Sequence, residues 1–301
     1  MYDAGSLIGI GKRALHKAYL LQVRLMKDGT AGEILSKNAQ GDKSTRADLE
    51  SEIEAIKVFK DANAPVRIIA EEHGLVDIVE NPRYLAVLDG VDGSSGLVAN
   101  PRSRCGTMLA IASTLDPKYN EFFFGGITEF STNRIFYGII GEGTFLVNDP
   151  NKMDDVSRIH RREIKKFDRG IRIHVDDCKL CPDYESNVTA GIDKISALVR
   201  ETFSLKAERN GNRLSALNSS AAMCIDLIMG EVDLVGGVIA KGAFEPPTEY
   251  VLVTGVGGVM TDIDGNDIGC KKWKEYGRNT IPLVRASSRE LGNTFAEFCQ
   301  P

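Results

Sequence analysis

Two acidic residues follow a short apolar run in the segment YLAVLDGVDGSSG, residues 84–96. Asp89 ends the apolar run, Asp92 follows three residues later, and four small residues come next: Gly93, Ser94, Ser95 and Gly96. A strand that ends here can direct two carboxylates into one cleft, and the small residues let backbone N–H groups face an anion. Carboxylates repel a phosphate unless cations lie between them, so the segment indicates a divalent metal, with Mg²⁺ as the ion suited to oxygen ligands. A plain Asp-Gly turn is the alternative for this segment taken alone.

Further acidic residues stand at two other positions. Glu71 and Glu72 end an apolar run over 66–70, and Glu245 precedes Pro246 and Pro247. Proline fits the first turn of a helix, which places Glu245 at a helix N-terminus. The β-branched and aromatic residues over 250–253 favour a strand instead, so both alternatives stand.

The elements that must position these residues begin with two helices. Apolar residues recur at helical spacing over 6–35, which predicts one long amphipathic helix. A second helix is expected over 47–61, with Leu49, Ile53 and Ile56 on its apolar face. Short β-type runs follow at 66–70, 84–88, 106–113, 122–128, 134–140 and 144–147. The last four predict an antiparallel meander, because their connections are too short for a crossover helix.

A polar and charged stretch over 148–168 is expected to be a solvated linker. It divides the chain into an N-terminal α+β half (1–150), with the main metal motifs, and a C-terminal α/β half (151–301), with Glu245 and the substrate-side residues. Beyond it we expect a strand at 171–175, helices at 192–202 and 218–229, and a strand at 234–239. This order favours an α+β or layered α/β fold over a regular βαβ array.

Composition excludes several classes of protein. The chain has 301 residues, 43% of them hydrophobic, and a formal net charge of −5, so binding to a nucleic-acid polymer is not expected. It contains no membrane-spanning stretch and no signal peptide, which predicts a cytoplasmic protein without a membrane partner. Its six cysteines, including the pair Cys178 and Cys181, are expected to be reduced thiols there.

Three motifs together, IIAEE, LDGVDGSS and FEPPTEYVLVTGVGGVMTD, resemble those of a known superfamily. This superfamily consists of metal-dependent, lithium-sensitive phosphatases and includes the inositol monophosphatases and the fructose-1,6-bisphosphatases. The resemblance runs from about residue 14 to the C-terminus and is weakest over 149–204. It implies a layered αβαβα sandwich with the site between two halves. It also implies a Mg²⁺-dependent phosphatase acting on a small phosphorylated metabolite, and a homodimer.

The resemblance also assigns roles residue by residue. Glu71, Asp89 and the main-chain carbonyl of Val91 would hold one metal, and Asp89, Asp92 and Glu245 a second, with two or three Mg²⁺ ions in the site. Glu71 and Ser94 would orient the attacking water. The N–H groups of Gly93, Ser94 and Ser95 would bind phosphate, and Ser219 would lie beside the substrate with Asn218 and Ser220. Lys37, Thr45, Asp48 and Glu72 would lie behind or at the edge of the metal ligands.

Three positions depart from the pattern of inositol monophosphatases. Gly90 stands where many members have proline, and we expect it to loosen the loop that carries Asp89. The pair Phe244-Glu245 replaces Trp-Asp and, with Ser95, favours the fructose-bisphosphatase branch. Asn218 replaces glycine, which puts the sugar contacts carried over to that position in doubt.

The sequence leaves the substrate open. Fructose-1,6-bisphosphate, inositol-1-phosphate and a nucleotide such as 3′-phosphoadenosine 5′-phosphate are the candidates. A basic cluster of Lys206, Arg209 and Arg213 could hold a second phosphate, or could be an exposed turn. A non-catalytic protein that binds phosphorylated metabolites is the alternative of another class. Four retained carboxylates and Ser94 argue against it, because binding alone does not need so costly a cluster of charges.

Overall fold

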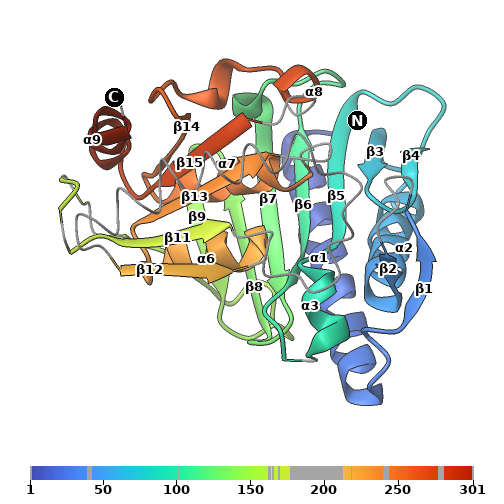
Figure 1. Ribbon diagram of the computed structural model, residues 1–301. Coiled ribbons are helices and arrows are strands. Elements are labelled where there is room, and N and C mark those ends of the chain that lie inside the picture. Colours follow the sequence, from blue (N-terminus) through green and yellow to red (C-terminus); the bar gives the residue numbers. More distant parts are fainter. Residues whose placement is uncertain are drawn as a thin grey trace.

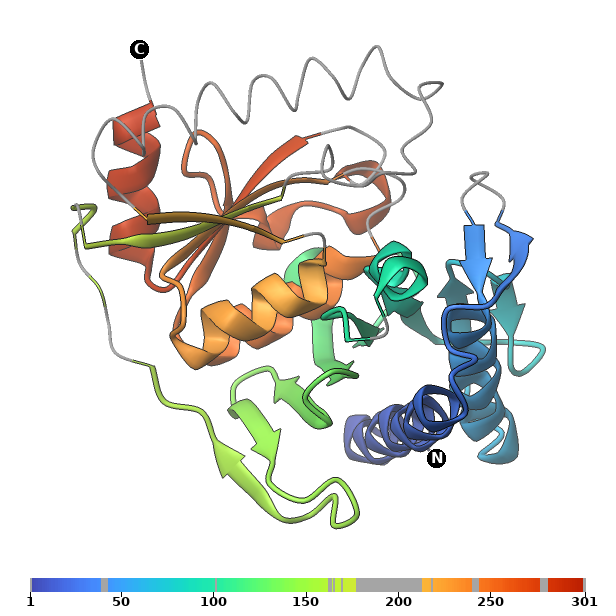
Figure 2. The same cartoon turned by 60° about the horizontal axis from the view of Figure 1, so that its bottom comes forward.

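The computed structural model describes residues 2–38, 43–100, 102–161, 164, 166–168, 170–176, 213–217, 219–239, 244–276 and 281–299. Two sheets alternate with helices (Figures 1 and 2). Helices α1 (Ala4–Asp28) and α2 (Arg46–Asp61) cover one face of the larger sheet, and α6 (Ser220–Met229) and α7 (Glu245–Gly255) lie between the two sheets. Helix α9 (Arg289–Cys299) covers the outer face of the smaller sheet. The expected layered αβαβα sandwich is confirmed.

The larger sheet has eight strands in the order β10-β9-β8-β7-β6-β5-β3-β4. They are β3 (Val66–Ala70), β4 (Gly74–Asp77), β5 (Tyr84–Asp92), β6 (Gly106–Ala112), β7 (Phe122–Glu129), β8 (Arg134–Ile139), β9 (Gly143–Val147) and β10 (Val156–Arg158). Strands β6 to β9 pair antiparallel in sequence order, which confirms the predicted meander. Strand β5 pairs parallel with β3, so the acidic segments that end these two strands meet at one edge.

The smaller sheet has the order β12-β11-β13-β15-β14. Its strands are β11 (Arg172–Asp176), β12 (Arg213–Leu217), β13 (Leu234–Ile239), β14 (Val259–Asp262) and β15 (Ile281–Ala286). Strands β1 (Ile34–Lys37) and β2 (Lys43–Thr45) form a separate hairpin. Short helical turns complete the described chain: α3 (Ser94–Ala99), α8 (Trp273–Tyr276), η1 (Tyr119–Glu121) and η4 (Ile268–Cys270). The helix expected at 192–202 and the Cys178/Cys181 pair lie outside the described residues.

The first helix is shorter than the sequence pattern predicts. It ends at Asp28, because Gly29 adopts the left-handed conformation with φ 70° and its N–H binds the carbonyls of Leu25 and Met26. The residues beyond this cap form β1 rather than further helix. Apolar spacing alone did not reveal the end, since apolar residues continue into the strand.

The second helix has the expected bounds but a different buried face. Ile53, predicted to be in the core, is 49% exposed, whereas Asp48 and Glu52 are buried. The buried side is apolar at Ile56 and Phe59, and polar toward the helix N-terminus. The expected apolar face is therefore wrong in part, because the buried side of α2 includes Glu52, which binds the turn after β3.

The charged stretch 148–168 is not simply a solvated linker. The side chain of Arg161 is 4% exposed and lies 3.0 Å from the carboxylate of Asp233. It also donates to the carbonyls of Leu227 and Val232 near the C-terminus of α6. The expectation of a solvated face holds for Lys166, which is exposed. It is wrong for Arg161, whose contacts join the charged stretch to the second half of the chain.

The largest apolar cluster lies between the two sheets and contains residues from both halves of the chain. Leu85 and Phe136 of the larger sheet pack in it with Ile225 of α6, Leu252 of α7 and Leu283 of the smaller sheet. The division at residue 150 stays a prediction. Among the described residues, no helix combines the length and the apolar character needed to cross a bilayer.

Candidate active site

A β-bulge brings the two aspartates of β5 to one face of the sheet. Asp89 lies opposite Met108 and Asp92 opposite Gly106, so Gly90 and Val91 together face the single residue Thr107. In a regular strand, residues three apart point to opposite faces. The extra residue of the bulge removes this alternation, and both carboxylates therefore point the same way.

Glu245 completes an acidic cluster with these aspartates. Each of Asp89, Asp92 and Glu245 offers one carboxylate oxygen, and these oxygens lie within 4.8 Å of one another. Glu245 is the first residue of α7, followed by Pro246 and Pro247. The helix predicted from these prolines is confirmed, and the alternative of a strand over 250–253 is wrong.

The N-terminus of α6 holds Asp92. Ser219, the N-cap of α6, donates its hydroxyl to Oδ2 of Asp92 at 2.6 Å, and the N–H of Ala221 donates to the same oxygen at 2.7 Å. Burial raises the pKa of Asp92, and these hydrogen bonds act in the opposite direction. The predicted substrate-side residue Ser219 thus lies next to the cluster, 3% exposed.

Glu71 approaches the cluster from the turn between β3 and β4. Its N–H donates to the carbonyl of Leu88 at 3.1 Å, and its carboxylate accepts from Asn38 at 3.4 Å. Burial raises the pKa of Glu71 to about 9, with a smaller contribution from the negative charge of Glu245. The acidic run after β3 therefore belongs to the same site as the aspartates of β5.

The turn that carries Glu71 is held by a carboxylate that the sequence analysis missed. Glu52 of α2 is fully buried and accepts from the backbone N–H groups of Glu72, at 3.1 Å, and His73, at 3.0 Å. It also binds Nδ1 of His73 at 2.7 Å, and this hydrogen bond raises the pKa of His73. Glu52 stands four residues after Asp48, on the same helix face, which is the signal that could have identified it.

Three of the four residues expected behind the metal ligands lie near the start of α2. Thr45 and Asp48 form a capping box, with the Thr45 hydroxyl 2.7 Å from Oδ2 of Asp48. Burial raises the pKa of Asp48 to about 7, while hydrogen bonds from Thr45 and Ser94 act against the rise. Glu72 accepts a hydrogen bond from Ser44. The fourth of these expected residues, Lys37, is exposed on β1.

The donor set fits a hard divalent cation. Oδ1 of Asp89 is buried and has no hydrogen-bond partner, and Asp89 as a whole is 2% exposed. Burial, and then repulsion from Glu71 and Asp92, raises its pKa well above the ordinary value. Burial also raises the pKa of Glu245 to about 8. Asp89 is buried, Asp92 and Glu245 are partly buried, and clustered carboxylates of this kind offer the oxygen ligands that Mg²⁺ prefers.

Gly90 tightens the site, contrary to the expectation that it loosens the loop carrying Asp89. The residue is buried within β5, against the first turn of α2. A Cβ added at Gly90 would lie 2.2 Å from the carbonyl oxygen of Asp48. Glycine is needed at this position because the backbones of β5 and α2 approach too closely for a side chain.

The expected phosphate-binding residues lie just beyond Asp92. Gly93 adopts φ 81° and precedes α3, which begins at Ser94; Ser94 is partly buried and Ser95 is exposed. Among the basic residues, Arg213 begins β12 with its backbone opposite Arg172. Lys206, Arg209 and Asn218 lie outside the described residues.

A buried ion pair lies near the cluster and was also missed. Nε of Arg285 on β15 donates to Glu249 on α7 at 2.9 Å, and both side chains are at most 4% exposed. Burial raises the pKa of both Asp92 and Glu245, and the positive charge of Arg285 acts against this rise. Arg285 therefore places a buried positive charge close to Asp92 and Glu245.

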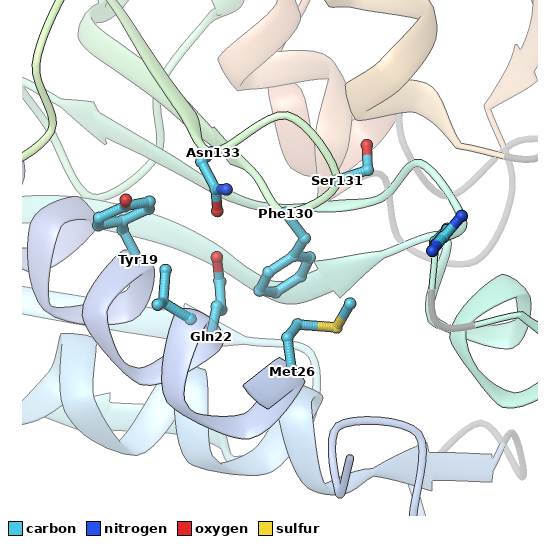
Figure 3. A pocket seen from close by; sticks show the side chains of 8 residues that line it. Tyr19, Gln22, Met26, Phe130, Ser131 and Asn133 are labelled. Carbon is cyan, nitrogen blue, oxygen red and sulfur yellow. The ribbon is translucent and has the colours of Figure 1, made fainter. Parts of the chain in front are cut away.

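A pocket lies on a different part of the surface. It has a volume of about 340 Å³ and is lined by Tyr19, Gln22, Val23, Met26, Arg102, Phe130, Ser131 and Asn133 (Figure 3). None of these residues belongs to the acidic cluster. The pocket therefore does not serve as the cleft in which the carboxylates meet.

Comparisons with known proteins agree with this geometry. No family model matches the chain. A fructose-1,6-bisphosphatase/inositol-1-monophosphatase of Methanothermobacter thermautotrophicus is 30% identical over 149 residues, which cover 47% of this chain and 53% of the relative. The match thus spans about half the length of the curated relative. The structure of the extragenic suppressor protein SuhB of Bartonella henselae covers 98% of both chains with a TM-score of 0.73 at 14% identity.

A second solved structure has the same fold. An inositol monophosphatase–fructose 1,6-bisphosphatase superposes with a TM-score of 0.70 at 18% identity, over 96% of this chain and 98% of its own. These two structures show that the chain has their fold. The layered fold is therefore shared over nearly the whole length of the solved structures.

Proposed function

We propose that this protein is a Mg²⁺-dependent phosphatase that hydrolyses a small sugar or inositol phosphate. The observation that carries the proposal is the convergence of Asp89, Asp92 and Glu245 within 4.8 Å, in a sandwich of the phosphatase type. The printed name of the curated relative, a fructose-1,6-bisphosphatase/inositol-1-monophosphatase, supports the substrate class. A protein that only binds metabolites would not need this cluster of buried, mutually repelling acids.

The metal ligands follow from the cluster and the superfamily resemblance. Glu71, Asp89 and the carbonyl of Val91 would hold one Mg²⁺, and Asp89, Asp92 and Glu245 would hold another, with two or three ions per site. When bound, the ions offset the charge of the phosphate and lower the pKa of a coordinated water.

The remaining steps use the chain's own groups. Glu71 and Ser94 orient the water for in-line attack on phosphorus, and the N–H groups of Gly93, Ser94 and Ser95 donate to the phosphate oxygens. Attack by water needs no covalent intermediate on the protein. The hydrogen bonds of Ser219 and Ala221 keep the Asp92 carboxylate in place.

The test is release of phosphate from a panel of substrates, with and without Mg²⁺ and with lithium as an inhibitor. The panel contains fructose-1,6-bisphosphate, inositol-1-phosphate and 3′-phosphoadenosine 5′-phosphate. Asp89→Asn removes a shared ligand, so we expect it to abolish turnover while the protein still melts cooperatively. Hydrolysis of no member of the panel, or a near-normal rate in Asp89→Asn at saturating Mg²⁺, would contradict the proposal.

The same panel tests the role of the basic residues. If Arg209 and Arg213 bind a second phosphate, Arg209→Ala and Arg213→Ala lose the preference for a bisphosphate over a monophosphate. An unchanged preference removes them from the site. A homodimer in the cytoplasm is also part of the proposal, and sedimentation of the purified protein tests the dimer.

A further inference from the structure

A buried polar network runs from α1 to the bulge of β5. Gln22 is only 2% exposed, on a helix face that is otherwise apolar. Its Nε2 donates to the hydroxyl of Thr107 and lies 3.4 Å from Oγ of Ser51, and its Oε1 accepts from Thr128 at 3.1 Å. Figure 3 shows the Gln22 side chain rising from α1 between Tyr19 and Met26. One amide thus connects α1 with β6, β7 and α2.

The network has a defined direction that ends on the bulge. The hydroxyl of Thr107 donates to the carbonyl of Gly90 at 2.6 Å. A hydroxyl carries one proton and the Gly90 carbonyl can only accept, so Thr107 donates its proton to Gly90 and accepts from Gln22. Thr128 donates its hydroxyl proton to Gln22, so the amide oxygen of Gln22 faces Thr128 and its NH₂ group faces Thr107. The order of donation is therefore Gln22 to Thr107 to Gly90.

This order matters because the bulge interrupts the ladder between β5 and β6. Thr107 is the one residue that faces both Gly90 and Val91. Its side chain supplies a hydrogen bond to the backbone where the regular pairing is lost. The Gly90 carbonyl and the Val91 N–H share one planar peptide, so the bond fixes the orientation of that peptide between Asp89 and Asp92.

We propose that Gln22 and Thr107 are positioning residues for the metal centre. They hold the bulge in the conformation in which the Val91 carbonyl and the carboxylates of Asp89 and Asp92 converge. This inference rests on the proposed metal-dependent function, and extends it to residues that contact neither metal nor substrate. A fully bonded buried network of this kind specifies one geometry, whereas an incompletely bonded one does not.

The test compares Mg²⁺ binding by calorimetry in full-length variants. Thr107→Val keeps the shape of the side chain and removes the hydroxyl, so we expect Mg²⁺ affinity to fall by about tenfold to a hundredfold, as is typical when a partner behind a ligand is lost. Thr107→Ser keeps the hydroxyl and should bind Mg²⁺ much more tightly than Thr107→Val. Gln22→Met is close in length but has no donor, so Thr107 loses the hydrogen bond that directs its hydroxyl toward Gly90. It should weaken Mg²⁺ binding in the same way.

Thr144 offers a matched control. It is also fully buried, and its hydroxyl donates to the carbonyl of Leu252 at 2.7 Å, away from the bulge. Thr144→Val should lose a comparable hydrogen bond and keep the wild-type Mg²⁺ affinity. Wild-type affinity in Thr107→Val, or an equal loss in both valine variants, would overturn the positioning role.

A second readout separates this inference from the proposed function. If the wild-type protein binds no Mg²⁺, the proposed function is contradicted, and the network is judged by amide hydrogen exchange at Val91 and Asp92 in the metal-free protein. We expect exchange there to be faster in Thr107→Val than in either the wild type or Thr144→Val. Equal exchange in all three proteins would overturn the inference by itself.

Discussion

At the scale of single residues, Gly90 determines how closely α2 can approach the acidic strand. The position tolerates no Cβ, because that atom would lie 2.2 Å from a backbone oxygen of α2. We expect Gly90→Ala to lower the free energy of unfolding by about 1 to 3 kcal/mol, as overpacking typically does. Urea denaturation measures the change.

Gly5 provides the comparison for this prediction. A Cβ at Gly5 on α1 would have its nearest neighbour at 3.7 Å, which is an ordinary contact. Gly5→Ala should therefore leave stability unchanged or raise it, since alanine favours helix. Equal effects of the two substitutions would contradict the close approach at Gly90.

The buried acids predict how the metal-free protein responds to pH. Burial raises the pKa of Asp48 to about 7, of Glu245 to about 8 and of Glu71 to about 9. Between the ordinary carboxyl range and these values, the folded protein keeps protons that the unfolded chain has released. Stability in a chelator should therefore be greatest at low pH within the folded range and fall as the pH rises toward about 9.

Melting temperatures across this pH range, with chelator and with excess Mg²⁺, measure the effect. Because Mg²⁺ binds the ionised carboxylates, the stabilisation by Mg²⁺ should increase as the pH rises. A melting temperature in chelator that stays level or rises with pH would contradict the raised pKa values.

The acidic residues that lie within sequence motifs were easier to identify from the sequence than the buried polar residues that hold these motifs in place. Asp89, Asp92 and Glu245 follow apolar runs or precede prolines, and the structure brings all three together. Gln22 and Glu52 lie on helices, where a polar side chain in the sequence is read as facing solvent. The spacing from Asp48 is a signal for Glu52, whereas only the three-dimensional packing shows that Gln22 is buried.

At the scale of elements, α6 is held at both ends by residues distant in the sequence. Its N-terminus binds Asp92, and carbonyls near its C-terminus accept hydrogen bonds from Arg161. We expect Arg161→Met to lower the free energy of unfolding by about 3 kcal/mol, because it leaves buried acceptors and Asp233 without this partner. Urea denaturation measures the loss.

Lys166→Ala serves as the control, since Lys166 belongs to the same charged stretch and is exposed. Its effect should lie within about 0.5 kcal/mol of zero. A similarly small effect of Arg161→Met would show that the charged stretch is a solvated linker after all.

The positions of helices and strands were predicted well where a β-type or helical run of residues was bounded by Gly, Asn, Asp or Pro. Strand β3 has the predicted bounds, and the meander from β6 to β9 follows the predicted order. The strands β4 and β10 are short edge strands, and nothing in their own residues distinguishes them from loops. Strand β5 extends beyond its apolar run through both aspartates, because pairing with β6 continues across the bulge.

At the scale of the whole molecule, the shared core predicts one cooperative unfolding unit. Residues from both halves of the sequence pack in the cluster between the two sheets. Arg104 adds a polar connection, since it binds Glu129 at the end of β7 and Asp226 on α6 at 2.7 Å each. Each half also has an apolar cluster of its own, and the shared cluster and Arg104 join the two.

Scanning calorimetry of the metal-free protein checks this expectation. The calorimetric enthalpy of unfolding should equal the van't Hoff enthalpy, as for a two-state transition. Two resolved transitions would instead support halves that unfold independently, divided near residue 150.

The bulge in β5 also explains what the spacing of its two aspartates encodes. Side chains alternate between the two faces of a strand, so residues separated by an even number of positions lie on the same face. The bulge lets an odd separation act as an even one, since two residues of β5 stand opposite Thr107 alone. Two aspartates separated by a single residue in a regular strand would share a face just as well. Compared with aspartates two positions apart, the spacing of three therefore places one more peptide group, with its carbonyl oxygen, between the two carboxylates.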